Sequence, residues 1–334
     1  MRGFRFSHLG LAAALAVAAS ASAAAAAAVP ASAATTTYTI TDLGSLGGGT
    51  ANARAINASG EVTGGSTLST GGTRAFLWRN GKMTDLGTLP GGGNSAGRAI
   101  NSSGEVVGHA IDSGDFSQAV LWTPNSTTAT KLGGADVVGI NDSGEIVGGV
   151  AGVSAGPVGD RTSLPVPPGF ITCSPAGINN NGQVLGNCEV TNVTGDWHGV
   201  VWTNGTPTVL PTLGGTVATS ATTLPLATAI NNNGQVVGTA VTSTGAVDGF
   251  SWSNGKITDL GPAFAPAAIN DNGVIVGGQF IDSGGTLHNL NNLIPAGSGY
   301  QIQSATGIND NGQIVANATD TGTSQNHALL LTPN

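Results

Sequence analysis

The chain has 334 residues and a formal net charge of −8, and only 8% of its residues are charged. Nucleic-acid binding depends on clustered Lys and Arg, so this balance excludes a typical nucleic-acid-binding protein. The 54 glycines indicate many turns and argue against long helices.

The first segment has the layout of a secretory signal peptide. Arg2 and Arg5 precede a long alanine-rich apolar run, which ends in the small-x-small pattern Ala31-Ser32-Ala33. An uncleaved membrane anchor is the alternative interpretation, because the run is long enough to span a bilayer. Removal of residues 1–34 leaves 8 basic and 18 acidic residues, a net charge of −10. We expect residues 35–334 to form one secreted domain, monomeric and free of the membrane.

The rest of the chain is built from a repeat. A nine-residue pattern, first seen as INASGEVTG, recurs seven times at spacings of 38 to 52 residues and starts at Ile56, Ile100, Ile140, Ile178, Ile230, Ile269 and Ile308. Each copy predicts a β-hairpin, because two apolar runs flank a polar turn. The turn always carries Gly at the place where a left-handed residue is needed.

A second hairpin follows in most copies. Phe76-Leu77-Trp78 leads into Asn80-Gly81 and then into Asp85-Leu86-Gly87. Asn-Gly between apolar runs is a strong hairpin signal, so each unit has four antiparallel strands, A to D. Four such strands in about 40–50 residues are typical of a propeller blade. The sequence therefore predicts an all-β protein, a β-propeller of seven four-stranded blades.

Two blades are irregular. In the third copy, Pro165, Pro167 and Pro168 lie where strand C or D is expected. The sixth copy runs from Val276-Gly277-Gly278 almost directly into Phe280-Ile281. For either blade, three strands remain an alternative.

The ends of the domain predict a closed ring. Tyr38–Gly44 has the pattern of a D strand, yet no blade precedes it. The last copy has strands A, B and C, the latter over His327–Leu331, but no strand D. Pairing of the two segments would close the ring and remove exposed sheet edges.

The only two cysteines, Cys173 and Cys188, are predicted to form a disulfide. They flank the fourth hairpin, in which Ile178 faces Val184. Continued antiparallel pairing places the cysteines opposite each other to within one residue, within reach of a disulfide. Secretion would supply the oxidising compartment in which such a bond persists. Two buried free thiols are the alternative.

The sequence resembles the family called "probable extracellular repeat, HAF family". The likeness covers essentially residues 38–333 and is carried by the Ile-Asn-x-x-Gly hairpins and by Asp42–Gly48, Asp85–Leu89, Leu293–Gly299, Gly307–Asn309 and His327–Pro333. It departs at the His-Ala-Phe element, because the place of His327 is taken in other copies by Arg74, Gln118, His198 and Asp248. The resemblance implies an extracellular location and a repeat fold, and it supplies no catalytic residue.

Two arginines are candidate binding residues. Arg54 and Arg98 occupy the same place in adjacent blades, two residues before Ile-Asn. We interpret them as groups that hold an anion near the central channel. The alternative is that they pack locally or pair with a neighbouring Asp.

Most acidic residues recur at fixed repeat positions, which indicates structural roles. Those that do not recur are assigned to the segments between strands B and C, namely Asp112, Asp115, Asp160, Glu189, Asp196, Asp248 and Asp320. These segments share a face of a propeller with the D–A loops. Asp112, Asp115, Asp196 and Asp248 are the candidate binding residues of a shallow acidic face. Solvated loop acids are the alternative interpretation.

No catalytic, cofactor or metal-binding pattern is evident. The four histidines of the mature chain form no His-x-x-x-His or Cys-His cluster, and no Gly-x-Ser-x-Gly elbow is present. A tryptophan recurs just before the C–D turn, at Trp78, Trp122, Trp202 and Trp252. We interpret these residues as blade packing, with a sugar-stacking platform as the alternative.

These features favour a secreted binding or scaffold module without catalysis, whose partner is an extracellular polysaccharide or protein. Two other hypotheses remain open. One is a propeller-type carbohydrate-active enzyme, either a glycoside hydrolase or a lyase, which needs a converging carboxylate pair. The other is a structural component of a matrix or coat.

Overall fold

Each Ile-Asn repeat folds as the hairpin that its glycine predicts. The seven turn glycines, from Gly60 to Gly312, all have positive φ angles, between 71° and 79°. A side chain at this backbone position would be strained, which explains why the residue does not vary among the copies. The apolar runs on either side of each turn form the two inner strands of a sheet.

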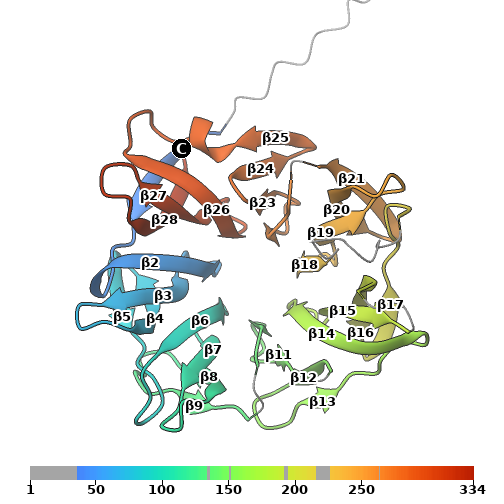
Figure 1. Cartoon of the computed structure of the whole chain (residues 1–334), viewed down its shortest axis with the longest axis horizontal. Coiled ribbons are helices and arrows are strands. Elements are labelled where there is room, and N and C mark those ends of the chain that lie inside the picture. The colour runs from blue at the N-terminus through green and yellow to red at the C-terminus, as the bar shows by residue number, and fades with distance from the viewer. Residues whose placement is uncertain (1–35, 134–135, 150–151, 192–194, 216–225, 263) are drawn as a thin grey trace, which may run out of the picture. The chain divides into compact units, whose positions relative to one another are not determined.

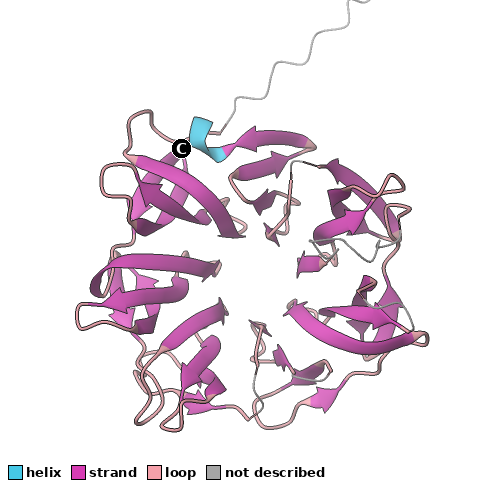
Figure 2. Ribbon diagram, in the orientation of Figure 1, coloured by secondary structure: helices cyan, strands magenta, loops and turns pink. Residues whose placement is uncertain are grey.

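The protein is a seven-bladed β-propeller. The computed structural model describes residues 36–133, 136–149, 152–191, 195–215, 226–262 and 264–334. Seven four-stranded antiparallel sheets are arranged in a ring (Figures 1 and 2). Residues of all seven blades line a central channel. The one helical turn among the described residues is the 3-10 segment Leu290–Asn292, drawn cyan in Figure 2.

Six blades follow the chain order from strand A at the channel to strand D at the rim. Blade one comprises β2 (Gly47–Ile56), β3 (Val62–Leu68), β4 (Thr73–Arg79) and β5 (Lys82–Asp85). Blade two comprises β6 (Ser95–Ile100), β7 (Val106–Ile111), β8 (Ser117–Trp122) and β9 (Thr130–Lys131). Blade three comprises β10 (Gly139–Ile140), β11 (Ile146–Gly148), β12 (Ser154–Gly156) and β13 (Thr162–Ser163). Blade four comprises β14 (Phe170–Ile178), β15 (Val184–Val190), β16 (Trp197–Thr203) and β17 (Thr206–Val209). Blade five comprises β18 (Ala227–Ile230), β19 (Val236–Val241), β20 (Val247–Ser253) and β21 (Lys256–Gly261). Blade six comprises β22 (Ala268–Ile269), β23 (Ile275–Gly277), β24 (Phe280–Ser283) and β25 (Thr286–Asn289).

The seventh blade closes the ring as predicted. It contains β26 (Tyr300–Ile308), β27 (Ile314–Asp320) and β28 (Asn326–Pro333), with β1 (Tyr38–Asp42) as its outer strand. Tyr38 faces Pro333, and Asp42 faces Leu329. Asp42 Oδ2 also accepts a hydrogen bond from the Tyr300 hydroxyl at 2.9 Å and lies 2.8 Å from His327 Nδ1. Contacts from Tyr300 on β26 and His327 on β28 to Asp42 on β1 therefore link the two ends of the domain.

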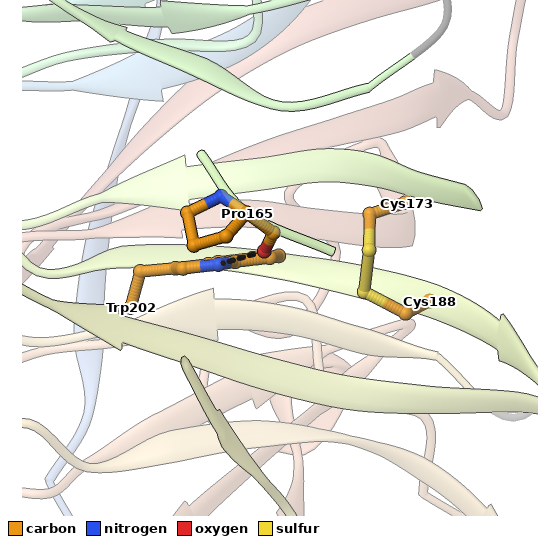
Figure 3. Close-up of a disulfide and its surroundings, with 4 residues drawn as sticks. All are labelled: Pro165, Cys173, Cys188 and Trp202. Carbon is orange, nitrogen blue, oxygen red and sulfur yellow. Dashed lines mark hydrogen bonds between the residues drawn. A yellow bond between two sulfur atoms is a disulfide. The ribbon is translucent and has the colours of Figure 1, made fainter. Parts of the chain in front are cut away.

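Blades three and six each have four strands, so the three-stranded alternative is wrong for both. Strand C of blade three is the short β12, and Pro165 to Pro168 follow strand D instead of replacing it. The carbonyl of Pro165 accepts a hydrogen bond from the indole N–H of Trp202 in the next blade, at 2.8 Å (Figure 3). The proline segment thus covers the neighbouring tryptophan.

The predicted disulfide between Cys173 and Cys188 is confirmed (Figure 3). The two residues face each other directly across β14 and β15. A register shift between Pro175 and Gly177 accounts for the one-residue offset expected from simple counting. Both cysteines are buried, at 2% and 0% exposure, in a cluster with Val184, Val200 and Trp202.

A ring of buried asparagines joins all seven blades. The Asn of each Ile-Asn turn donates from Nδ2 to the backbone carbonyl of the equivalent Asn in the next blade, over 2.9 to 3.2 Å. The last of these bonds runs from Asn309 to Asn57 and closes the circle. Each of these carbonyls also accepts from the turn glycine of its own hairpin, so the bond between blades uses its second acceptor site and links the turn to the neighbouring blade.

The proposed signal peptide, residues 1–34, lies outside the described residues. Within the described part of the chain, no helix is long and apolar enough to cross a membrane.

Candidate functional site: the central channel

The innermost strands of five blades contain a β-bulge at one repeat position, and three of the five bulge residues line the channel. In five blades the register of strand A shifts two residues before the Ile of the Ile-Asn turn, at Arg54, Arg98, Ala176, Thr228 and Thr306. A bulge leaves one residue unpaired, and it changes the direction of that side chain relative to the alternating side chains of a regular strand. The equivalent residues of blades three and six are Val138 and Ala267.

The channel wall has three layers. The bulge residues Arg54, Arg98 and Thr306 line a cavity of about 400 Å³ at one end, together with the equivalent residues Val138 and Ala267. The seven repeat isoleucines form the middle layer. At the other end a cavity of about 270 Å³ has a polar rim of turn residues: Ala58, Ser102, Asp142, Asn180, Asn232, Asp271 and Asp310. The channel therefore runs from an arginine end to an aspartate end across an apolar belt.

The aspartate end is an extension of the asparagine ring. Asp142, Asp271 and Asp310 accept hydrogen bonds from backbone N–H groups of the preceding blade's turn, at 2.7 to 2.8 Å. These contacts support the structural role inferred for acids at repeat positions. The sequence interpretation did not identify this rim, because its members contact one another only across blades that lie 38 to 52 residues apart.

At the arginine end, both predicted arginines line the same cavity. Arg98 Nη1 lies 2.9 Å from Asp136 Oδ1 and donates to the Val137 carbonyl of the next blade at 3.3 Å. This is the pairing with a neighbouring Asp that was considered from the sequence. Arg98 is thus held in place, and its charge is partly balanced.

Arg54 is different, because its guanidinium has no such partner. Thr228 and Thr306, at the same bulge position, donate to the equivalent carbonyl of the next blade, as Arg98 does. Arg54 makes no such bond and has no ion pair with a described carboxylate, and its side chain is exposed. Among the described residues that line the cavity, Arg54 is therefore the cationic group without an ion-pair partner.

The charges at the arginine end affect the pKa of His109 on β7. Burial lowers the pKa of its imidazole below the ordinary value of 6.5, and the charges of Arg98 and Arg54 lower it further. Asp136 opposes them weakly, since it favours the protonated ring. Two arginines affecting one histidine indicate a positive potential at this end of the channel.

The predicted acidic face does not form one site. Asp112 closes its own loop: its carboxylate accepts from the backbone N–H groups of Phe116 and Gly114, which lower its pKa, and from Gln118. Asp115 is exposed at the tip of the same loop, with φ at 63°. Neither residue is among the channel-lining side chains.

Asp196, Asp248 and Asp160 lie elsewhere. Asp196 is 3.4 Å from His198 Nε2 beside a small cavity of about 20 Å³ between blades four and five. Asp248 lies within β20, is 9% exposed, and has one carboxylate oxygen without a hydrogen-bond partner among the described residues. Asp160 precedes β13, so its assignment to a B–C segment is wrong: it lies in the C–D turn of blade three.

Metal-ligating clusters of three or more His, Cys, Asp or Glu side chains are absent from the described residues.

The fold is shared with solved propellers. The chain matches a puromycin-hydrolyzing peptidase of Mycobacterium tuberculosis with 15% identity and a TM-score of 0.51, over 82% of this chain and 52% of the peptidase. It matches a prolyl endopeptidase structure with 10% identity and a TM-score of 0.52, over 89% of this chain and 50% of that one. A chain of the mitotic checkpoint complex matches with 11% identity and a TM-score of 0.52, over 88% of this chain and 91% of the other.

These similarities establish the β-propeller fold alone. The chain spans about half the length of the two peptidases. No family model matches the sequence, and no curated protein matches it. The channel geometry is therefore the basis for any inference about function.

Proposed function

We propose that this protein is a secreted binding module that holds an anionic group of an extracellular polymer at the arginine end of its channel. One observation carries the proposal: Arg54 is exposed, has no partner among the described residues, and lines a cavity of about 400 Å³ together with Arg98. A guanidinium binds carboxylates and sulfates through parallel N–H donors, which suits it to such a group.

The electrostatic setting supports the same conclusion. The chain as a whole is acidic, with a net charge of −8. A positive site at the mouth of a channel in an acidic molecule attracts anions locally, because low-dielectric walls focus the field. The acidic surroundings would at the same time repel polyanions that cannot reach the channel.

The cavity is suited to binding and not to catalysis. Its lining consists of two arginines, a valine, an alanine and a threonine. None of these side chains is an acid or base that exchanges protons near neutral pH. Cleavage of a glycosidic bond needs two carboxyl groups that flank it, and this lining holds none.

Binding assays with charged and neutral polymers test the proposal. We expect polygalacturonate, alginate or poly-glutamate to bind, with affinity that falls as salt rises, and neutral dextran not to bind at this site. Arg54→Gln should weaken binding about tenfold or more. Arg74→Gln, outside the channel, is the matched control. Equal binding by Arg54→Gln and the wild type would refute the proposal, and chromatography of the recovered polymer would reveal any cleavage.

We also propose that residues 1–34 are removed on export and that the chain belongs with the extracellular HAF repeat proteins it resembles. The disulfide supports export, because such bonds persist in oxidising compartments. N-terminal sequencing of protein from the culture medium should begin near Thr35. A chain that starts at Met1 in the membrane fraction would favour the anchor instead.

A further inference from the structure

The seam between the last and first blades contains a further cavity, of about 260 Å³, on the face of the A–B and C–D turns. It is lined by both blades, and its main side chains are Glu61, Trp78, Arg79, Asn80, Gln313 and Leu330. The neighbouring outer strands β28 and β1 are not consecutive in the chain, so no short C–D turn joins them here. The cavity is separate from the two that line the channel.

Trp78 borders this cavity and is less buried than the equivalent tryptophans of blades two and four, whereas Trp252 of blade five is half-buried like Trp78 but lines no part of this cavity. The tryptophans at the same repeat position in blades two and four, Trp122 and Trp202, are 0% and 1% exposed, as blade packing predicts. Trp78 instead remains half-buried and forms part of the cavity wall. The indole packs against the apolar cluster of the seam and also borders the cavity, so part of it is available to stack on a ligand.

The charged groups of the cavity cancel each other. Arg79 Nε lies 2.9 Å from Glu61 Oε1, and Glu61 Oε2 accepts from Asn57 Nδ2 at 2.8 Å. An anionic ligand would have to compete with Glu61 for the arginine, and a cationic ligand would have to compete with Arg79 for the carboxylate. The cavity therefore favours a ligand that is polar but uncharged.

Gln313 adds an unused hydrogen-bond donor. Its Oε1 accepts from Asn309 Nδ2 at 2.9 Å, whereas its Nε2 makes no hydrogen bond to a described residue. Asn80, in the exposed C–D turn of blade one, supplies a second amide at the rim. Planar amide and guanidinium groups around one aromatic face match a sugar ring, whose C–H groups line its faces and whose hydroxyls lie at its edge.

We propose that this cavity at the seam of blades seven and one is a binding site for a neutral pyranose unit of a saccharide. The indole of Trp78 would stack on the sugar ring, and Gln313, Asn80 and the Arg79–Glu61 pair would bond its hydroxyls. The volume of about 260 Å³ is below the roughly 300–1,000 Å³ of sites for drug-sized ligands, which fits one sugar residue at a chain end or branch. The site lies apart from the arginine cavity and does not depend on it.

Isothermal titration of the mature protein with cellohexaose, maltohexaose, xylohexaose and mannohexaose tests the proposal. We expect at least one of these neutral oligosaccharides to bind and to shift the tryptophan fluorescence. Trp78→Leu should weaken that binding about tenfold or more. Leucine is tolerated at this repeat position, because blade seven carries Leu331 there. Trp252→Leu, in blade five, is the matched control and should bind as the wild type does.

Gln313→Glu provides a second variant with little risk of misfolding. Blades one to three already carry Glu at this position, bonded to the turn Asn as Gln313 is. The change removes the amide donor and adds a charge, so binding should weaken about fivefold. Gln235→Glu, away from the cavity, should bind normally. The proposal is overturned if no neutral oligosaccharide binds, or if Trp78→Leu and Gln313→Glu bind as tightly as their controls. Arg54→Gln should leave this binding unchanged, which separates the two sites.

Discussion

At the scale of single residues, four asparagines of the ring use their whole hydrogen-bonding capacity: Asn57, Asn141, Asn179 and Asn231. Asn231 Oδ1 accepts from the backbone N–H groups of Asn233 and Gln235, at 3.1 and 2.9 Å. Its Nδ2 donates to Gln235 Oε1 at 2.7 Å and to the Asn270 carbonyl at 2.9 Å. A side-chain amide has two acceptor sites and two donors, so Asn fills this place as no other residue of its size can.

Replacement of Asn231 with Asp should therefore destabilise the protein sharply. Asn231→Asp keeps the shape but replaces two donors with a carboxylate oxygen that faces two acceptors. We expect the free energy of unfolding to fall by about 2–3 kcal/mol, measured by urea denaturation. Asn254→Asp, in the exposed C–D turn of blade five, is the control and should change it by less than about 1 kcal/mol. Equal effects of the two variants would contradict the role of the ring.

His109 should make stability depend on pH. Its pKa in the folded protein lies below 6.5, so the unfolded chain binds a proton more readily. The free energy of unfolding should fall as the pH drops below 6.5 toward the native pKa, and rise again on return to neutrality. His109→Gln should show a weaker loss between pH 7 and pH 5 in urea titrations. A variant whose pH profile matched the wild type would show that His109 does not contribute.

At the scale of strands and hairpins, the disulfide braces blade four. Cys173 and Cys188 close a loop with a sequence separation of 15. A loop of about that size corresponds to roughly 3 kcal/mol in the chain-entropy model. We expect the double variant Cys173→Ala/Cys188→Ala to lose about that much stability in urea denaturation. Because both residues are buried, the wild-type disulfide should resist reductant until the protein unfolds. Two thiols that alkylate in the unreduced, unfolded protein would contradict the bond.

The regular elements were predictable from the sequence because each depends on local signals. Gly at one turn position and Asn-Gly at the other identify both hairpins of a blade. Strand C of blade three was not recognised, because Ser154–Gly156 is short and lacks the Phe-Leu-Trp pattern. Of the candidate site, Arg54 and Arg98 line one cavity because they share a repeat position, which the sequence does show. The asparagine ring and the cavity beside Trp78 depend on contacts between blades, which a repeat pattern does not reveal.

At the scale of the whole molecule, stability depends on how the ring is closed. Adjacent blades pack through apolar clusters, as where Trp122 and Val106 of blade two contact Ala75 and Leu77 of blade one. Blade seven makes the same kind of contact with blade one, where Val315 and Leu330 join a cluster with Val62 and Phe76. The outer strand β1 belongs to blade seven, which packs directly against blade one. Loss of β1 should therefore destabilise both blades at this seam.

Deletion of residues 36–44 tests this closure. The deletion removes Tyr38 and Leu43, each 4% exposed, together with Asp42 and its bonds to Tyr300 and His327. Burial of two such apolar side chains is worth about 3–6 kcal/mol, which corresponds to a fall in melting temperature of about 10 °C. The control is the chain that begins at Thr36. The freed edge of β28 should also pair with other copies, so light scattering should detect aggregation on heating. An unchanged melting temperature would show that the ring is stable without β1, and that the asparagine ring and the inner strands hold it closed on their own.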